Sequence, residues 1–233
     1  MVIPYEFRGY EYEYVDGKIR VLLGYCADDN GEEPVTINSQ VDLLIDPTTV
    51  GVNGMDTGGL GSNCFMNVFV IVNPTTEHTG GLLSVSKDSP TLPEGYTKKR
   101  FIGYFRTVNS QQILDFAVTG KMDARTLKYR CDMATHNQVL GNGTVLNWTS
   151  IDVSHRIPSD AKYGCYCLCN MGTAPVYFRP YESEDDGEII PVHYCGHKEY
   201  AIAHVTDGKV EYKVVSGGVA SAGVCGFEFS LAG

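Results

Sequence analysis

The chain has 233 residues, of which 43% are hydrophobic and 20% are charged, as in an ordinary globular protein. Its 18 basic and 28 acidic residues give a formal net charge of −10, which disfavours a general role on nucleic-acid backbones or anionic membranes. No apolar run approaches the roughly 20 residues of a membrane-spanning helix, and the first residues lack the pattern of a secretory signal. We therefore expect synthesis in a cytosol, without membrane insertion and without nucleic acid as a partner.

The first predicted element is a β-hairpin. Tyr10, Tyr12 and Tyr14 alternate with glutamates, so a strand there has one aromatic face and one acidic face. Asp16-Gly17 then predicts a type I′ turn into a second strand over 18–23. The aromatic face either packs into the core or forms a contact surface, and these three tyrosines are candidate interface residues.

Further short strands are predicted along the whole chain, because β-branched and aromatic segments alternate with Gly, Pro, Asn and Asp. The segment 110–117 could form a turn or two of helix. The predicted strands are 41–45, 65–72, 101–106, 126–131, 163–169, 176–178, 189–194 and 224–230, together with a second hairpin in which Asp207-Gly208 joins 204–206 to 209–214.

Short strands at this spacing predict an all-β fold with little helix, namely an antiparallel β-sandwich of jelly-roll-like type. A chain of this length forms one large β domain or two small ones. We expect a single domain over 1–233, in which 107–148 holds a loop excursion or an extra sheet.

Residues 51–107 contain a run of short motifs around two apolar strands. The motifs are NGxDTG at 53–58, NPTT at 73–76, GLLSxS at 81–86 and PTLPxGYTxKR at 90–100. None of them supplies an evident nucleophile, metal cage or phosphate cradle, so their role is architectural. The pattern resembles a β-structured module of tailed-bacteriophage structural proteins, most often seen in tail-fibre and other virion-surface proteins.

The resemblance implies a non-enzymatic virion structural protein, either a tail-fibre or tail-associated component or a capsid-surface (decoration) component. Its partners would be other virion proteins of the capsid or tail, and it would reach the virion after synthesis in the host cytoplasm. Analogy with fibres also implies a homo-oligomer, with a trimer as one arrangement. For 110–117 the resemblance makes a strand as plausible as a helix. The alternative is a receptor-binding module, or adhesin, that recognises a host surface glycan.

One weak metal candidate is present. His193, Cys195 and His197 would share a face of a strand, and imidazole and thiolate are good zinc ligands. A tetrahedral site needs a fourth ligand, and the neighbouring sequence has no CxxC or HxxxH partner. A structural strand with solvent-facing histidines is the favoured interpretation, so we expect no metal and no cofactor.

Acidic residues cluster in YESEDDGEII at 181–190. The candidate contact residues here are Glu182, Glu184, Asp185 and Asp186. Their spacing is not that of an EF-hand loop, although clustered carboxylates can hold calcium. A solvated acidic loop is favoured, and it is also a candidate for contact with a basic patch on another virion protein.

The remaining patterns give no evident active site. The chain has no GxSxG nucleophile motif, and no residues meet the nucleophile, base and orienter test. Lys98-Lys99-Arg100 is a small basic spot, for which a charged strand edge is favoured over a nucleic-acid site. Cys165, Cys167 and Cys169 alternate along a predicted strand and are expected to be buried free thiols. We therefore expect no catalytic residues.

Overall fold

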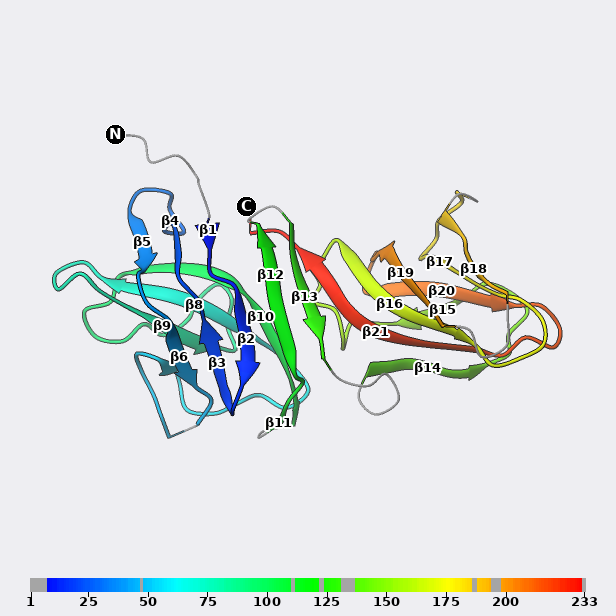
Figure 1. Ribbon diagram of the computed structural model, residues 1–233, viewed down its shortest axis with the longest axis horizontal. Helices are drawn as coiled ribbons and strands as arrows, with labels where there is room; N and C mark the ends of the chain where they lie inside the picture. Colours follow the sequence, from blue (N-terminus) through cyan, green and yellow to red (C-terminus); the bar gives the residue numbers. More distant parts are fainter. Residues whose placement is uncertain are drawn as a thin grey trace. The chain divides into compact units, whose positions relative to one another are not determined.

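The computed structural model describes residues 8–46, 48–109, 112–121, 124–130, 137–185, 188–193 and 198–231. The fold is nearly all β and is built from several antiparallel sheets, which confirms the predicted all-β, sandwich-like class. The chain divides into two compact units, of which unit 1 comprises 1–127 with 230–233 and unit 2 comprises 128–229 (Figure 1). We predicted a single domain over 1–233, and the division into two compact units does not test whether the two units form one domain.

Unit 1 contains three groups of hydrogen-bonded strands, all antiparallel except for the parallel pair β7 and β9. The first group, in spatial order, is β12 (Phe116–Lys121), β2 (Tyr12–Val15), β3 (Lys18–Val21) and β6 (Val41–Leu44). The second is β11 (Gln112–Ile113), β10 (Lys98–Asn109), β8 (Phe65–Asn73), β9 (His78–Ser84) and β7 (Gly54–Met55). The third is β1 (Arg8–Gly9), β4 (Gly24–Ala27) and β5 (Pro34–Ile37), and β13 (Ala124–Tyr129) neighbours β12 at the border of the unit.

The core of unit 1 lies between the first and second groups of strands. The ring of Tyr12 meets that of Phe116 edge-on at 5.8 Å, and the rings of Phe105 and Phe116 stack at 6.2 Å. The hydroxyl of Tyr12 donates to the carbonyl oxygen of Tyr104 at 2.8 Å. The aromatic face of β2 thus packs inward, and its buried hydroxyl has the hydrogen-bond partner that burial demands.

Two of the three candidate interface tyrosines are therefore core residues. Tyr12 is buried, and so is Tyr10, whose hydroxyl donates to the carbonyl oxygen of Val35 at 2.6 Å. Tyr14 is half-buried. Of the two alternatives for the aromatic face, the structure selects the core for Tyr10 and Tyr12, because their hydroxyls are satisfied within unit 1.

The motif segments of 53–58, 81–86 and 90–100 meet around one carboxylate. Asp56 accepts from the Thr57 amide at 2.7 Å, from the Ser84 hydroxyl at 2.6 Å and from the Thr91 amide at 3.1 Å. Asn53 accepts from the amide of Gly81 at 2.8 Å. These contacts give the motif the architectural role predicted for it.

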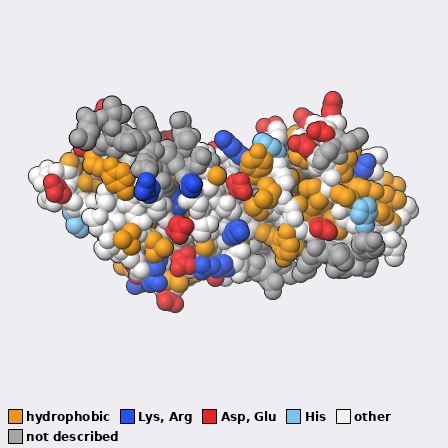
Figure 2. Space-filling model, turned by 45° about the horizontal axis from the view of Figure 1, so that its top comes forward, with side chains coloured by type: hydrophobic (Ala, Val, Ile, Leu, Met, Phe, Trp, Pro, Cys, Tyr) orange, Lys and Arg blue, Asp and Glu red, His pale blue; other side chains and the backbone are white. Residues whose placement is uncertain are grey.

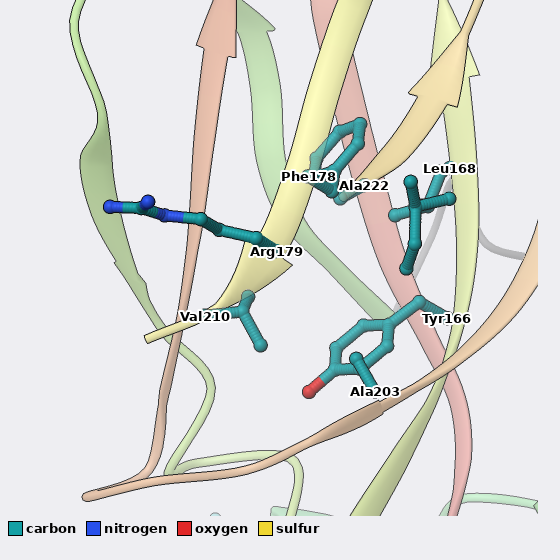
Figure 3. Close-up of a pocket in the computed structure, with 8 residues that line it drawn as sticks. Tyr166, Leu168, Phe178, Arg179, Ala203, Val210 and Ala222 are labelled. Atoms are coloured by element: carbon teal, nitrogen blue, oxygen red, sulfur yellow. The ribbon is translucent and has the colours of Figure 1, made fainter. Parts of the chain in front are cut away.

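Unit 2 contains two sheets. In one, β19 (Lys198–His204), β16 (Tyr163–Asn170) and β21 (Ala220–Phe229) lie side by side, and β14 (Gln138–Gly143) also pairs with β21. In the other, the order is β15 (Thr149–Asp152), β20 (Lys209–Val214), β17 (Val176–Pro180) and β18 (Ile190–Val192). Apolar side chains of both sheets line a small cavity between them, among them Tyr166, Leu168, Phe178, Val210 and Ala222 (Figure 3).

Both predicted Asp-Gly turns are present, with different consequences. Asp16 and Gly17 have φ of 48° and 79° and join β2 to β3 in register, which confirms the first hairpin. Asp207 and Gly208 have φ of 52° and 66°, but the two flanking segments pair only through the isolated bridge between Thr206 and Lys209. The second predicted hairpin is therefore wrong beyond its turn. β19 and β20 belong to different sheets, so the second turn carries the chain from one sheet to the other.

The poorly patterned region 107–148 is not one loop excursion, because it contains β11, β12, β13 and β14. Within 110–117, residues 112 and 113 form β11 and residues 116 and 117 begin β12, so the strand alternative holds for these four residues, whereas 114 and 115 connect the two strands. Residues 110 and 111 lie outside the described residues.

Candidate contact surfaces

The first candidate surface is the outer face of the sheet formed by β15, β20 and β17. Tyr177 lies opposite Lys213, and Arg179 lies opposite Glu211. Along β17 the alternate residues Val176, Phe178 and Pro180 are buried, so Tyr177 and Arg179 face outward. Figure 3 shows Arg179 pointing away from the inward side chains Phe178 and Val210.

Trp148 lies on this face, one residue before β15, and contacts side chains of β17 and β20. The guanidinium carbon of Arg179 is 4.1 Å from the centroid of the Trp148 ring, and the ammonium of Lys213 is 4.6 Å from it. The same ammonium is 5.6 Å from the centroid of the Tyr177 ring. We call these four residues the Trp148 face. Contacts of this kind are attractive because the face of an aromatic ring carries negative potential.

The charges on the Trp148 face are only partly compensated. Nε of Arg179 donates to Glu211 at 2.7 Å, and the two side chains are 19% and 11% exposed, so this ion pair is largely shielded from water. Within the part of the chain that the structure describes, Lys213 has no carboxylate at ion-pair distance. The face therefore combines flat aromatic surface with one cation, Lys213, that has no counter-charge among the described residues.

The opposite end of the same sheet face is charge-balanced. The ammonium of Lys209 is 4.6 Å from the centroid of the Tyr181 ring, and Lys209 lies opposite Asp152 across the strands. Hydrogen bonds from Ser154 hold the pKa of the Asp152 carboxyl below its ordinary value. A hydrogen bond to Glu182 raises the pKa of Tyr181.

The second candidate surface is strand β19, which we call the β19 edge. In the described part of the chain β19 pairs with β16 on one side and stands at the end of its sheet. Tyr200 and Ile202 are 75% and 59% exposed, and they point away from the cavity that Ala203 lines. Figure 2 shows hydrophobic side chains gathered over unit 2, on the right of the view.

The acidic loop predicted at 181–190 is an exposed loop in the residues that are described. Glu182, Glu184 and Asp185 are exposed. The hydroxyl of Ser183 donates to Glu188 at 2.5 Å. Asp186 lies outside the described residues, as does Gly187. A role for this loop in contact with a basic partner stays a prediction.

The predicted metal candidates are mostly outside the described residues. His193 is exposed, whereas Cys195 and His197 are not described. Among the residues with a described structure, no group of three or more His, Cys, Asp or Glu side chains is placed to hold a metal ion. Whether His193, Cys195 and His197 come together to bind a metal therefore stays a prediction, because only His193 is described.

The basic spot at 98–100 is engaged within unit 1. Lys99 pairs with Asp29 at 2.5 Å, and Lys98 lies 3.9 Å from Asp28. Arg100 is buried and donates to the carbonyl oxygens of Asp28 and Leu231. These side chains tie β10 to the loop that follows β4.

Cys165 and Cys167 are free thiols in the described part of the chain, as expected for them. Cys165, Cys167 and Cys169 alternate on β16, where Cys167 and Cys169 are buried and Cys165 is half-buried. Burial raises the pKa of the Cys165 thiol to about 11. A thiol that stays protonated is a poor nucleophile and a poor metal ligand, so Cys165 acts as a small apolar group.

Sequence reasoning missed the Trp148 face, although one signal was present. Charged and aromatic residues recur at every second position in Tyr177-x-Arg179 and Lys209-x-Glu211-x-Lys213, which is the spacing of one strand face. Comparison with protein families, curated proteins and solved structures finds no match for this chain. In the described residues, no helix has the length and apolar character needed to cross a membrane.

Proposed function

We propose that the protein is a non-enzymatic structural protein of a bacteriophage particle, in a tail fibre, elsewhere on the tail or on the capsid surface. It acts by making protein–protein contacts, either with other virion proteins or with further copies of itself. The motif pattern of 53–100 supports this proposal through its resemblance to virion-surface proteins. The observation that carries it is the β19 edge.

The β19 edge has the properties of a surface that a protein partner covers. A strand at the end of a sheet offers unpaired backbone groups to another chain, and most proteins protect such strands with charge, proline or a covering segment. Here two large apolar side chains, Tyr200 and Ile202, are exposed on that strand. Covering them with a partner would add buried apolar area to backbone pairing.

The test is the location and the retention of the chain in purified particles. Immunogold electron microscopy of virions from a lysate that contains the chain should label the head, the tail or the fibres. The double variant Tyr200→Ser with Ile202→Ser should be incorporated at least about tenfold less. A matched control changes Val50 and Val85 to Ser, since these residues are 58% and 53% exposed in unit 1.

Two results would contradict the proposal. Absence of label from every particle would remove the virion assignment. Equal incorporation of the β19 variant and the control would remove the β19 edge as the contact surface. Light scattering of the purified protein then reports whether the chain associates with itself, with a trimer as the arrangement that fibres suggest.

The second candidate function is receptor binding, with a host surface glycan as the ligand. The Trp148 face favours it, because Trp and Tyr give a rigid apolar surface with polar edges at low entropic cost. The test is adsorption of the labelled protein to host cells, which free host glycan should compete away. Adsorption that is indifferent to free glycan would contradict it.

A further inference from the structure

We propose that the Trp148 face binds a saccharide that carries a carboxylate. The inference rests on the receptor-binding function and names its site and the chemical class of its ligand. Trp148 and Tyr177 supply the stacking surface, and Lys213 and Arg179 bind the carboxylate.

Lys213 and Arg179 both have N–H donors that are not used in hydrogen bonds within the described part of the chain. Lys213 has no carboxylate partner in the described part of the chain, although its ammonium is held between the rings of Trp148 and Tyr177. Arg179 donates to Glu211 through Nε, and within the described residues its two terminal nitrogens make no hydrogen bond. A guanidinium offers five N–H donors in a planar fork that matches a carboxylate.

The ring and the cations are adjacent. The Arg179 guanidinium carbon and the Lys213 ammonium both lie within 5 Å of the Trp148 centroid, at 4.1 Å and 4.6 Å. Trp148 is half-buried, so part of its surface meets solvent. The C–H face of a sugar ring carries slight positive potential and packs on the negative face of an aromatic ring. One ligand can thus pack on the part of the Trp148 ring that stays exposed and present an anion to the two cations beside it.

The charge of the chain selects an acidic saccharide over a nucleic acid. Single-stranded nucleic acids also combine stacking with cations, but they carry one phosphate per nucleotide. The chain has a net charge of −10, and Glu211 compensates part of the positive charge on this face. A dense polyanion would meet repulsion beyond the face, whereas a sugar with isolated carboxylates places each anion beside Lys213 and Arg179.

The experiment uses the fluorescence of Trp148, which is the only tryptophan of the chain and therefore reports this face alone. The probes are 3′-sialyllactose against lactose, and trigalacturonate against its methyl ester, so that each pair tests the contribution of the carboxylate. We expect saturable quenching by the acidic member of at least one pair, with at least about tenfold weaker binding by the neutral member.

The matched variants are Lys213→Met, which keeps the apolar stem, and Lys162→Met, which changes an exposed lysine elsewhere in unit 2. Lys213→Met should weaken the acidic ligand at least about tenfold, and Lys162→Met should leave its affinity unchanged. Thermal unfolding of each variant confirms the fold, and Lys213→Gln repeats the test with a polar side chain.

The outcomes separate the inference from the function on which it rests. Equal affinity for an acid and its neutral counterpart overturns the acidic class while receptor binding stands. If free glycan competes with adsorption but Lys213→Met leaves adsorption unchanged, the Trp148 face is not the binding site, although receptor binding stands. Failure of every saccharide to quench Trp148, together with adsorption that glycan does not compete, overturns both. Quenching by a single-stranded DNA 12-mer, with strong salt dependence and no response to saccharides, assigns the face to nucleic acid instead.

Discussion

The hydroxyl of Ser84 donates to the carboxylate of Asp56 at 2.6 Å, joining residues 28 positions apart in the chain. The same carboxylate oxygen accepts from the amide of Thr91 at 3.1 Å, and the other oxygen accepts from Thr57. Asp56 is buried, so water replaces few of these contacts when they are lost. One side chain therefore fixes β9, the segment after β7 and the loop that leads to β10.

The first prediction concerns this carboxylate. Asp56→Ala leaves the Ser84 hydroxyl and the Thr57 and Thr91 amides without their acceptor, and we expect it to lower the free energy of unfolding by about 2–4 kcal/mol. Urea unfolding followed by circular dichroism measures the change. Asp88→Ala, at an exposed aspartate in the loop before β10, is the control and should change stability by less than about 0.5 kcal/mol. Equal effects of the two variants would contradict the structural role of Asp56.

The second prediction compares the two Asp-Gly turns. Gly17 and Gly208 both have positive φ, so an alanine at either position adopts a backbone conformation that costs about 1–2 kcal/mol. At Gly17 the new Cβ has open space, whereas at Gly208 it would lie 2.9 Å from Cβ of Ser154. We expect Gly208→Ala to destabilise more than Gly17→Ala by about 1 kcal/mol. Chemical unfolding of both variants tests the difference, and the reverse order would contradict the tight contact at Gly208.

Much of the fold could be predicted from the sequence because its signals are local. The Asp16-Gly17 turn is set by two residues that both tolerate positive φ, and the alternation of β2 follows directly before it. Long apolar segments such as β8 and β16 were also identified, with ends shifted by about one residue. β4 and β5 were missed because each has four residues and begins with Gly or Pro, which are turn signals.

The position of the Tyr10 side chain could not be predicted, because an argument from alternating residues assumes one regular strand through residues 10–14. Tyr10 has φ of 55° and precedes β2, so it does not follow the alternation of Tyr12 and Tyr14. It reaches the core through its hydrogen bond to Val35 on β5. A backbone irregularity of this kind is decided by tertiary packing, which a pattern of residue types does not contain.

The Trp148 face could not be predicted because it is assembled from β17, β20 and the residue that precedes β15. Arg179 and Glu211 are 32 residues apart and meet through the register of β17 and β20. A one-residue slip of either strand would turn its side chains to the other face. The residue types were visible in the sequence, but the register that joins them was not.

The third prediction concerns the cavity between the sheets of unit 2. Tyr166 is 2% exposed, and its hydroxyl makes no hydrogen bond within the described residues. Removing a buried hydroxyl that lacks a partner removes a desolvation cost, so Tyr166→Phe should leave stability unchanged or raise it by up to about 1 kcal/mol. Tyr12→Phe is the matched control, because it removes a buried hydroxyl that donates to Tyr104. It should cost about 1 kcal/mol, and an equal loss in both variants would contradict the prediction.

The fourth prediction concerns Gly164, which faces the same cavity residue. A Cβ at this position would lie 2.3 Å from the hydroxyl oxygen of Tyr166 and 2.7 Å from Cδ1 of Ile157. Gly164→Ala should therefore destabilise unit 2 by about 1–3 kcal/mol. Gly141→Ala is the control, since its Cβ would meet only the flexible end of the Gln138 side chain. Urea unfolding that ranks the two variants equally would contradict the close packing at Gly164.

The last prediction is a pH dependence. Burial raises the pKa of the Cys26 thiol to about 12 from its ordinary value of 9.0. Below about pH 9 the thiol is protonated in the folded and the unfolded chain, so it adds no pH dependence there. Between about pH 9 and 12 the unfolded chain loses this proton first, so stability should fall as the pH rises.

Cys26→Ala tests the assignment of this pH dependence. The variant should lose less stability than the original chain between about pH 9 and 12, although cavity formation lowers its stability at every pH. Part of the slope should remain, because burial also raises the pKa of Tyr10. Unfolding by urea at a series of pH values gives both curves. If the two curves run parallel over this range, folding does not raise the pKa of the Cys26 thiol, and the prediction is wrong.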